Sequence, residues 1–159
     1  MCQFVNLAVA LSQLGRKVGI LDADIYGPSL PRLLGIPAAK AVQGEDGRLL
    51  PIEIYGIKAM SMGFMVDEAA PMIWRGPMVQ SALIQMLRDV AWDGIDMLVI
   101  DMPPGTGDIH LTLAQRVTLA GGVVVSTPQD IALIDARKGL EMFRKVSVPI
   151  LGIVENMSY

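Results

Sequence analysis

The stretch Ile95-Asp96-Met97-Leu98-Val99-Ile100-Asp101-Met102-Pro103-Pro104-Gly105-Thr106-Gly107-Asp108 decides the fold. Its apolar first half is typical of a short buried strand, and its second half is a turn rich in proline and glycine. Open α/β sheets bind their ligands at the carboxyl ends of parallel strands, which is where Asp101 lies. The pattern favours a magnesium–nucleotide site, although a strand-ending turn with a capping aspartate also fits it.

Two features of this stretch suit phosphate chemistry. Asp101 is placed to hold a magnesium ion or one of its waters. Gly105 and Gly107 have no Cβ, so their backbone N–H groups can approach a phosphate closely.

Composition limits the classes of protein that fit. A chain of 159 residues with 52% hydrophobic residues suits a single globular domain, 1–159. Its apolar stretches are strand-sized and no signal-type segment follows Met1, so we expect a soluble, non-secreted protein. A net charge of −3 offers no basic patch for nucleic acid or anionic lipid. The single cysteine, Cys2, excludes an internal disulfide and fits a reducing compartment.

The hydrophobic pattern alternates between strands and helices. We expect a surface loop at 36–47 and one or two short strands within 49–62. The other expected elements are strands at 18–22, 95–100, 121–127 and 148–154, and helices at 4–14, 30–34, 78–90 and 130–146. Such alternation predicts an α/β fold, with a mainly parallel sheet covered by helices on both faces.

Polar residues gather where three of these strands end. They are Asp22 with Asp24, the turn that starts at Asp101, and 127–130. In one parallel sheet these ends share an edge, which predicts a common site. Phosphoryl transfer needs carboxylates that hold magnesium and orient the attacking water, and Asp24 and Asp101 are suitably placed for those tasks.

Several motifs together resemble a known family. They are VGILDADIYGPSLPRLLG at 18–35, SMGF at 61–64, PMIWRGPM at 71–78, DMPPGTGD at 101–108, VSTPQDIALIDARKG at 125–139 and GIVENMS at 152–158. Over essentially its whole length the chain resembles the Mrp/ApbC family of iron–sulfur cluster carrier ATPases, within the MinD/ParA-like P-loop class. The resemblance implies a P-loop NTPase fold that uses ATP and Mg²⁺.

The resemblance also implies roles for individual residues. Asp22 and Asp24 match the first switch region, in which Asp24 is the catalytic residue that orients the hydrolytic water. Asp101 matches the magnesium carboxylate, and Gly105, Thr106, Gly107 and Asp108 match the second switch. Asn156 matches the position that reads the adenine edge, but a strand-end turn explains this asparagine equally well.

Two departures from the family pattern affect the expected function. The family's Walker A loop, ending in Gly-Lys-Ser/Thr, would precede the helix near Phe4, and only Met1 and Cys2 align with its last residues. The Cys-x-x-Cys pair that bridges a [4Fe-4S] cluster between two subunits would follow Tyr159. We therefore expect a chain lacking its first strand, its phosphate loop and its cluster ligands.

The resemblance implies that the parent protein hydrolyses ATP and transfers clusters to apoproteins. It implies a homodimer in the cytoplasm, or in the mitochondrial matrix of a eukaryote. The 159 residues alone are expected neither to hydrolyse ATP nor to transfer clusters efficiently, because the phosphate loop supplies much of the nucleotide-binding energy.

Two other functions remain open. A MinD/ParA-type positioning ATPase would act on a membrane or DNA, but the chain has no basic stripe. A non-catalytic interaction fragment is favoured by the missing Walker A loop. Met60, Met62 and Met65 are compatible with a soft-metal or adaptable surface, although core filling is the better explanation. Trp74 and Arg75 suit a partner surface or a packed loop.

Overall fold

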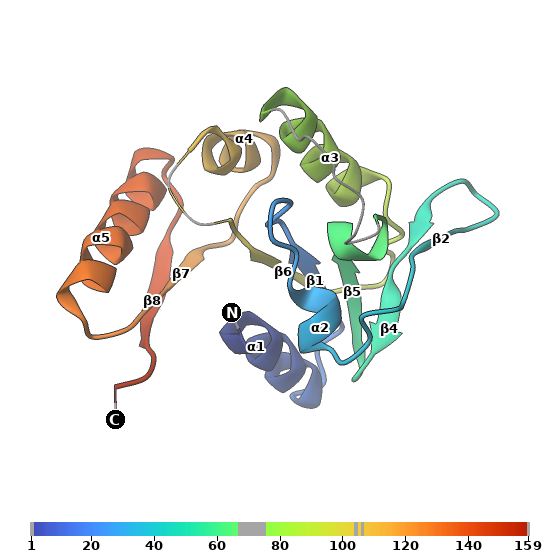
Figure 1. Ribbon diagram of the computed structural model, residues 1–159, viewed down its shortest axis with the longest axis horizontal. Helices are drawn as coiled ribbons and strands as arrows, with labels where there is room; N and C mark the ends of the chain where they lie inside the picture. Colours follow the sequence, from blue (N-terminus) through green and yellow to red (C-terminus); the bar gives the residue numbers. More distant parts are fainter. Residues whose placement is uncertain (1, 67–75, 104, 106, 159) are drawn as a thin grey trace. The chain divides into compact units, whose positions relative to one another are not determined.

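The computed structural model describes residues 2–66, 76–103, 105 and 107–158. The chain forms two compact units, Met1–Pro103 and Pro104–Tyr159 (Figure 1). Within the described residues, no helix is long and apolar enough to cross a membrane. Trp74 and Arg75, which we expected at a partner surface or in a packed loop, lie outside the described residues.

The first unit is built on a four-stranded sheet. Its strands are β4 (Ile52–Ile54), β5 (Ile57–Ser61), β1 (Val18–Asp22) and β6 (Met97–Asp101), in that order across the sheet. β1 is parallel to both β5 and β6, and β4 is antiparallel to β5. All five residues of β1 are buried, as expected of a central parallel strand with a continuous apolar sequence.

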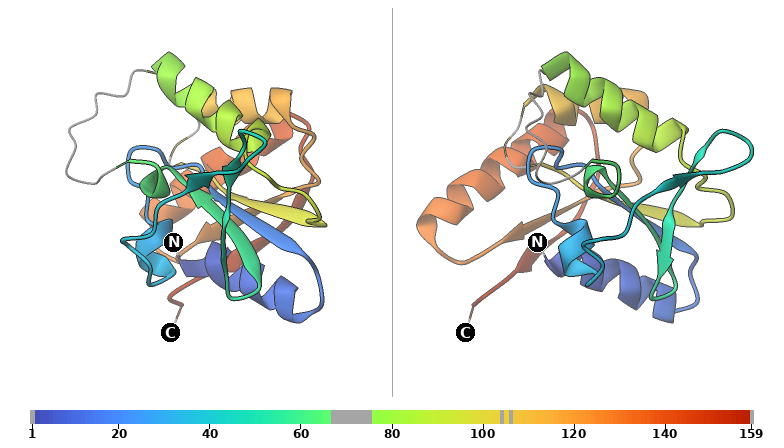
Figure 2. Two further views of the ribbon diagram at one scale, coloured as in Figure 1. Left: turned by 90° about the vertical axis from the view of Figure 1, so that its right-hand side faces the viewer. Right: turned by 45° about the vertical axis from the view of Figure 1, so that its right-hand side comes forward.

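Helices cover this sheet on both sides. α1 (Cys2–Gln13) and α3 (Gly76–Arg88) lie on opposite faces, and the short α2 (Leu30–Leu33) follows the loop after β1 (Figure 1, Figure 2). A 3₁₀ turn, η1 (Met62–Phe64), follows β5 directly. Ala8 of α1, Ile20 of β1 and Phe64 of η1 are fully buried in one core cluster. The predicted helices and strands of this unit are therefore confirmed.

A hairpin occupies part of the region that we expected to be a loop. β2 (Val42–Gln43) pairs antiparallel with β3 (Leu49–Leu50), so the prediction of a surface loop at 36–47 was wrong at 42–43 and is confirmed for the other residues. Asp46 accepts hydrogen bonds from the backbone N and the Nε of Arg48, and Gly47 has a φ of +81°. Asp-Gly is a strong hairpin signal, so turn chemistry in the sequence pointed to this hairpin.

The second unit is a βαβ arrangement preceded by a helix. It contains α4 (Asp108–Arg116), β7 (Gly122–Ser126), α5 (Asp130–Lys145) and β8 (Ile150–Glu155), with β7 and β8 parallel. The sequence analysis did not predict α4, a helix of nine residues. Among the described residues no ladder joins β6 to β7. The common edge predicted for 127–130 and the ends of β1 and β6 therefore stays a prediction.

Close packing inside the second unit provides a test of this arrangement. A Cβ added to Gly122 would lie 2.8 Å from two ring atoms of Phe143 on α5, whereas one added to Gly152 on the paired strand would meet nothing within 4 Å. Gly122→Ala is expected to lower the free energy of unfolding by about 1–3 kcal/mol, because α5 must move away from the sheet. Urea unfolding of Gly122→Ala and Gly152→Ala measures the difference. Equal stability of the two variants would contradict the packing of α5 on β7.

Candidate functional site

Three strand ends of the first unit lie side by side. Asp22 is in register with Ser61 of β5 on one side and with Asp101 of β6 on the other. The backbone N–H of Ala23 donates to the carbonyl of Asp101 over 2.9 Å, which joins the two strands at their carboxyl ends. The sheet therefore brings Asp22 and Asp101 together, as the sequence predicted.

The carboxylate of Asp22 is almost fully buried and accepts four hydrogen bonds. Its Oδ2 accepts from the backbone N of Ser29 (3.0 Å), the backbone N of Leu30 (3.1 Å) and the Oγ of Ser61 (3.1 Å). Its Oδ1 accepts from the backbone N of Asp24 at 3.1 Å. These contacts assign Asp22 to holding the loop after β1, and direct contact with a cofactor stays a prediction.

Asp24 presents a half-exposed carboxylate at the start of that loop. Its Oδ1 accepts a hydrogen bond from the backbone N of Gly27 over 3.2 Å, which closes a tight turn. A Cβ on Gly27 would lie 3.6 Å from the Oδ2 of Asp24, which is an ordinary van der Waals contact. The turn thus fixes one carboxylate oxygen through a hydrogen bond.

Negative charge is concentrated at this edge. Burial, together with the neighbouring negative charges of Asp22 and Asp24, raises the pKa of Asp101 to about 6. Burial also raises the pKa of Asp22, against the opposing effect of its four hydrogen bonds. A cation bound here would offset both the desolvation and the repulsion.

The donor set fits magnesium. Mg²⁺ takes oxygen ligands and commonly uses one or two carboxylates, with waters and phosphate oxygens completing the shell. Asp101 supplies one such carboxylate, since Asp22 already accepts four hydrogen bonds and Asp24 is predicted to orient the attacking water. The described part of the chain holds no group of three or more His, Cys, Asp or Glu side chains arranged for a metal ion.

The raised pKa of Asp101 predicts a pH-dependent loss of stability. The folded pKa of about 6 exceeds the ordinary 3.8, so the folded state binds more protons than the unfolded state between about pH 4 and 6. The unfolding free energy therefore falls as pH rises through this window. Asp101→Asn removes the penalty and is expected to be more stable than the parent chain by about 1–2 kcal/mol above pH 6, after allowance for partial exposure.

Thermal unfolding of Asp101→Asn and the parent chain at pH 4, 5, 6 and 7.5 checks this expectation. The difference between the two proteins should grow from pH 4 to pH 6 and then level off. A difference that stays constant across the range would show that Asp101 titrates normally in the folded chain.

The remaining predicted residues belong to the second unit. Gly105 is exposed with a φ of +101°, a conformation that favours glycine, and Gly107 is the N-cap residue of α4. Asn156 follows β8, and its backbone N donates to the carbonyl of Ser126 at the end of β7 over 2.7 Å. Thr106 lies outside the described residues. The nucleotide roles of these four residues stay predictions.

Sequence reasoning missed Ser61 as a site residue. This fully buried serine ends β5 at the same edge as the carboxylates and donates to Asp22. The available signal was a polar residue at the carboxyl end of an apolar strand, which is the signal that identified Asp22 and Asp101. The uncertain strand boundaries within 49–62 concealed it.

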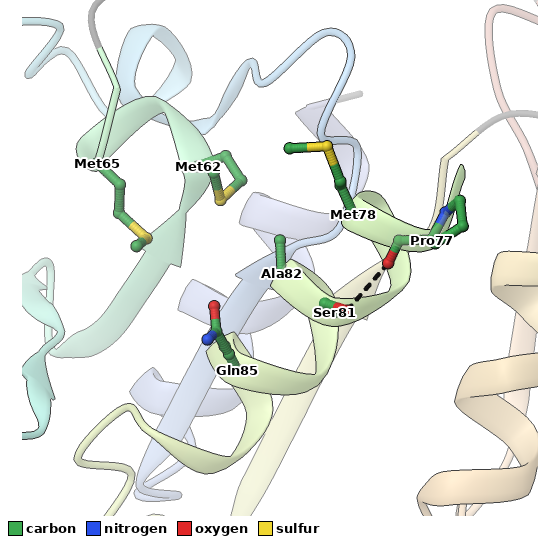
Figure 3. Close-up of a pocket in the computed structure, with 7 residues that line it drawn as sticks. All are labelled: Met62, Met65, Pro77, Met78, Ser81, Ala82 and Gln85. Carbon is green, nitrogen blue, oxygen red and sulfur yellow. Dashed lines mark hydrogen bonds between the residues drawn. The ribbon is translucent and has the colours of Figure 1, made fainter. Parts of the chain in front are cut away.

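A separate hollow of about 400 Å³ lies between η1 and α3 (Figure 3). Met62 and Met65 reach it from the η1 side and Met78 from α3, and the Oγ of Ser81 donates to the carbonyl of Pro77 at its edge. The hollow is lined by Met62, Met65, Pro77, Met78, Ser81, Ala82 and Gln85. Met60 and Met62 are buried, so core filling is confirmed for these two methionines.

Comparison with known proteins shows the family to which the chain belongs. The family described as "ParA: NUBPL iron-transfer P-loop NTPase" matches residues 3–159. The chain is 58% identical to an iron-sulfur cluster carrier protein of Pseudomonas fragi, over 96% of this chain and 54% of that protein. It is 57% identical to the carrier of Escherichia coli K12, over 97% of this chain and 42% of that protein.

A plant relative and two solved structures extend the comparison. An Arabidopsis thaliana protein named "Iron-sulfur protein required for NADH dehydrogenase, mitochondrial" is 55% identical over 97% of this chain and 49% of that protein. An ADP-bound nucleotide-binding protein of Archaeoglobus fulgidus superposes with a TM-score of 0.80 at 39% identity, over 98% of this chain and 60% of that chain. The septum site-determining protein MinD of Pyrococcus horikoshii, complexed with Mg-ADP, superposes with a TM-score of 0.66 at 19% identity, over 98% of this chain and 63% of that chain. At this identity the match supports the fold alone.

The chain spans about half the length of these curated relatives. Their motifs and fold nevertheless extend over nearly all of its residues, and the mainly parallel α/β architecture predicted from the sequence is confirmed. On this match the chain belongs to the ParA-related family of iron-transfer P-loop NTPases, the Mrp/ApbC group of iron–sulfur cluster carriers.

Proposed function

We propose that this chain is the switch-bearing part of an ATP-hydrolysing carrier that assembles iron–sulfur clusters and transfers them to apoproteins. The observation that carries the proposal is the pair of carboxylates, Asp24 and Asp101, at adjacent strand ends of a P-loop-type sheet. The names of the relatives supply the cargo, an iron–sulfur cluster.

The proposed mechanism assigns separate tasks to the three aspartates. Asp101 would hold a magnesium ion, which neutralises the charge of the transferred phosphate when it is bound. Asp24 orients the attacking water through its half-exposed carboxylate. Asp22 keeps Asp24 in place through the hydrogen bond from the backbone N of Asp24. Gly105, Thr106 and Gly107 would contact the phosphate, and Asn156 would contact the adenine edge.

The names of the relatives support the proposed cargo, and the family resemblance supports the proposed partners. The cluster is a substrate, and its thiolate ligands must come from outside the 159 residues, which contain one cysteine. We propose a homodimer that meets apo iron–sulfur proteins in the cytoplasm, or in the mitochondrial matrix of a eukaryote. The net charge of −3 makes nucleic acid and anionic membranes poor partners.

The test starts with the native protein purified from its source cell. Its intact mass is measured first, followed by ATP turnover and by transfer of a reconstituted [4Fe-4S] cluster to an apoprotein, read by circular dichroism. A mass well above 17.1 kDa, with both activities present, supports the proposal. A larger protein that transfers clusters at the same rate without ATP would overturn the ATPase part.

The 159-residue chain gives a second measurement. Its sequence contains no Gly-Lys-Ser or Gly-Lys-Thr, so it is expected to bind magnesium–ATP weakly. A native mass near 17.1 kDa with no ATP turnover would favour the non-catalytic interaction fragment instead. Tight binding of magnesium–ATP by the isolated chain would show that the phosphate loop is not needed.

A further inference from the structure

Ser61 makes two hydrogen bonds at the end of β5, and both are inside the protein. Its Oγ donates to the Oδ2 of Asp22 over 3.1 Å and accepts from the backbone N of Gly63 over 3.1 Å. The residue is fully buried. A hydroxyl has a single proton, so the bond from Gly63 leaves that proton directed at Asp22. Ser61 therefore has a fixed orientation, set by the first turn of η1.

Asp22 transmits this constraint to the loop that follows β1. Ser29 is the N-cap residue of α2, but its own side chain makes no capping bond. Asp22 supplies the cap from seven residues earlier, since its Oδ2 accepts from the backbone N of Ser29 and of Leu30. The other oxygen of Asp22 holds the backbone N of Asp24. One carboxylate thus ties both ends of the loop to the sheet.

We propose that Ser61 is a positioning residue for Asp24, acting through Asp22. Its hydroxyl sets the rotation of the Asp22 carboxylate, which in turn places the backbone of Asp24 and the start of α2. The proposal rests on the proposed ATPase function, in which Asp24 orients water. Ser61 lies 39 residues from Asp22 in the sequence, where β5 ends and η1 begins. Under this proposal β5 and η1 also shape the loop after β1.

A serine that merely fills a buried space would have a different effect. Ser61→Ala removes a few atoms from the core and leaves the backbone N of Gly63 without its acceptor, which costs stability whatever the role. A positioning role also predicts that the loop between Asp24 and Leu30 loosens while the rest of the sheet keeps its protection. It further predicts that the hydroxyl itself is required, so the loop in Ser61→Thr should be as well protected as in the parent protein.

The experiment compares Ser61→Ala and Ser61→Thr in the native protein, with Ser12→Ala as the matched control. Ser12 also donates its hydroxyl across the unit, to the carbonyl of Gly56 over 2.9 Å, but Gly56 precedes β5 and so lies at the opposite end of this strand from Ser61. The kcat for ATP of Ser61→Ala is expected to fall about tenfold with KM changed less than twofold, because misplacing Asp24 affects the reacting water more than nucleotide binding. Ser61→Thr and Ser12→Ala should stay within twofold of the parent.

Amide hydrogen exchange is measured on the same proteins, because it needs no activity. In Ser61→Ala the amides of Asp24, Ser29, Leu30 and Gly63 should exchange at least tenfold faster, with the amides of β1 and β6 unchanged. Faster exchange with no ATP turnover in any protein would sink the proposed ATPase function but leave the positioning geometry standing. Unchanged exchange at Asp24 and Ser29, or a kcat equal to the parent's, would overturn the role of Ser61.

Discussion

Asp24→Asn is expected to lower the ATP turnover of the native protein by about two to three orders of magnitude, with little change in KM. An amide cannot take a proton from the attacking water or orient it as a carboxylate does. The change should leave the loop intact, because the backbone N of Asp24 still donates to Asp22 and the amide oxygen can still accept from Gly27. Steady-state kinetics with saturating magnesium–ATP measures the loss.

Asp46→Asn is the matched control for Asp24→Asn. Asp46 is an exposed aspartate in the hairpin and pairs with Arg48. It also accepts a hydrogen bond from a backbone N two residues ahead, so the substitution makes the same chemical change in a similar local setting. Its turnover should equal that of the parent protein. Turnover by Asp24→Asn within twofold of the control would remove Asp24 from the proposed mechanism.

Asp22→Ala is expected to destabilise the first unit by about 3–5 kcal/mol, a large part of the usual stability of a domain. The change removes the acceptor of four hydrogen bonds at a site that is 1% exposed. The backbone donors of Asp24, Ser29 and Leu30 would then be left partly buried without partners. Urea unfolding followed by circular dichroism gives the free-energy difference.

Asp22→Asn removes the negative charge at this position but keeps one acceptor oxygen. An asparagine oxygen in the place of Oδ2 can still accept from Ser29, Leu30 and Ser61. Its NH₂ group then faces the backbone N–H of Asp24, which is a donor opposite a donor. We expect a smaller loss of about 1–2 kcal/mol together with displacement of Asp24. Equal losses for the alanine and asparagine variants would contradict the bonding assigned to Oδ2.

The two results together distinguish the roles of neighbouring aspartates. Asp24 should matter for turnover and little for stability, whereas Asp22 should matter for stability first. Asp101 should show the opposite sign to Asp22, because its substitution relieves a desolvated charge without removing the acceptor of four hydrogen bonds. The contrast between Asp22 and Asp101 tests the site without any need for a bound nucleotide.

Much of the first unit was predictable because its local signals are strong. The apolar run at 18–22 and the periodic pattern at 78–90 became β1 and α3 with small shifts at their ends. The hairpin at 42–50 and helix α4 were missed, since short elements depend on turn chemistry and tertiary contacts more than on periodicity.

The site was predictable in a similar, partial way. Strand-ending carboxylates identified Asp22, Asp24 and Asp101, because residues at the carboxyl ends of parallel strands share an edge. The same reasoning predicted 127–130 at that edge, and this stays a prediction, because β7 pairs with β8 inside the second unit. The order of strands in a sheet depends on which backbones pair. Periodicity within one strand does not encode its neighbours, so the sequence pattern alone does not predict this order.

By itself the sequence determined which stretches form the strands and helices, and which of them end in carboxylates. Only the tertiary structure decided what each carboxylate does. Asp22 and Asp24 are two residues apart and chemically identical, yet Asp22 is buried among four donors and Asp24 is half-exposed in a turn. The reason is register: pairing of β1 with β5 brings Ser61 next to Asp22, a contact between residues 39 positions apart that no local pattern contains.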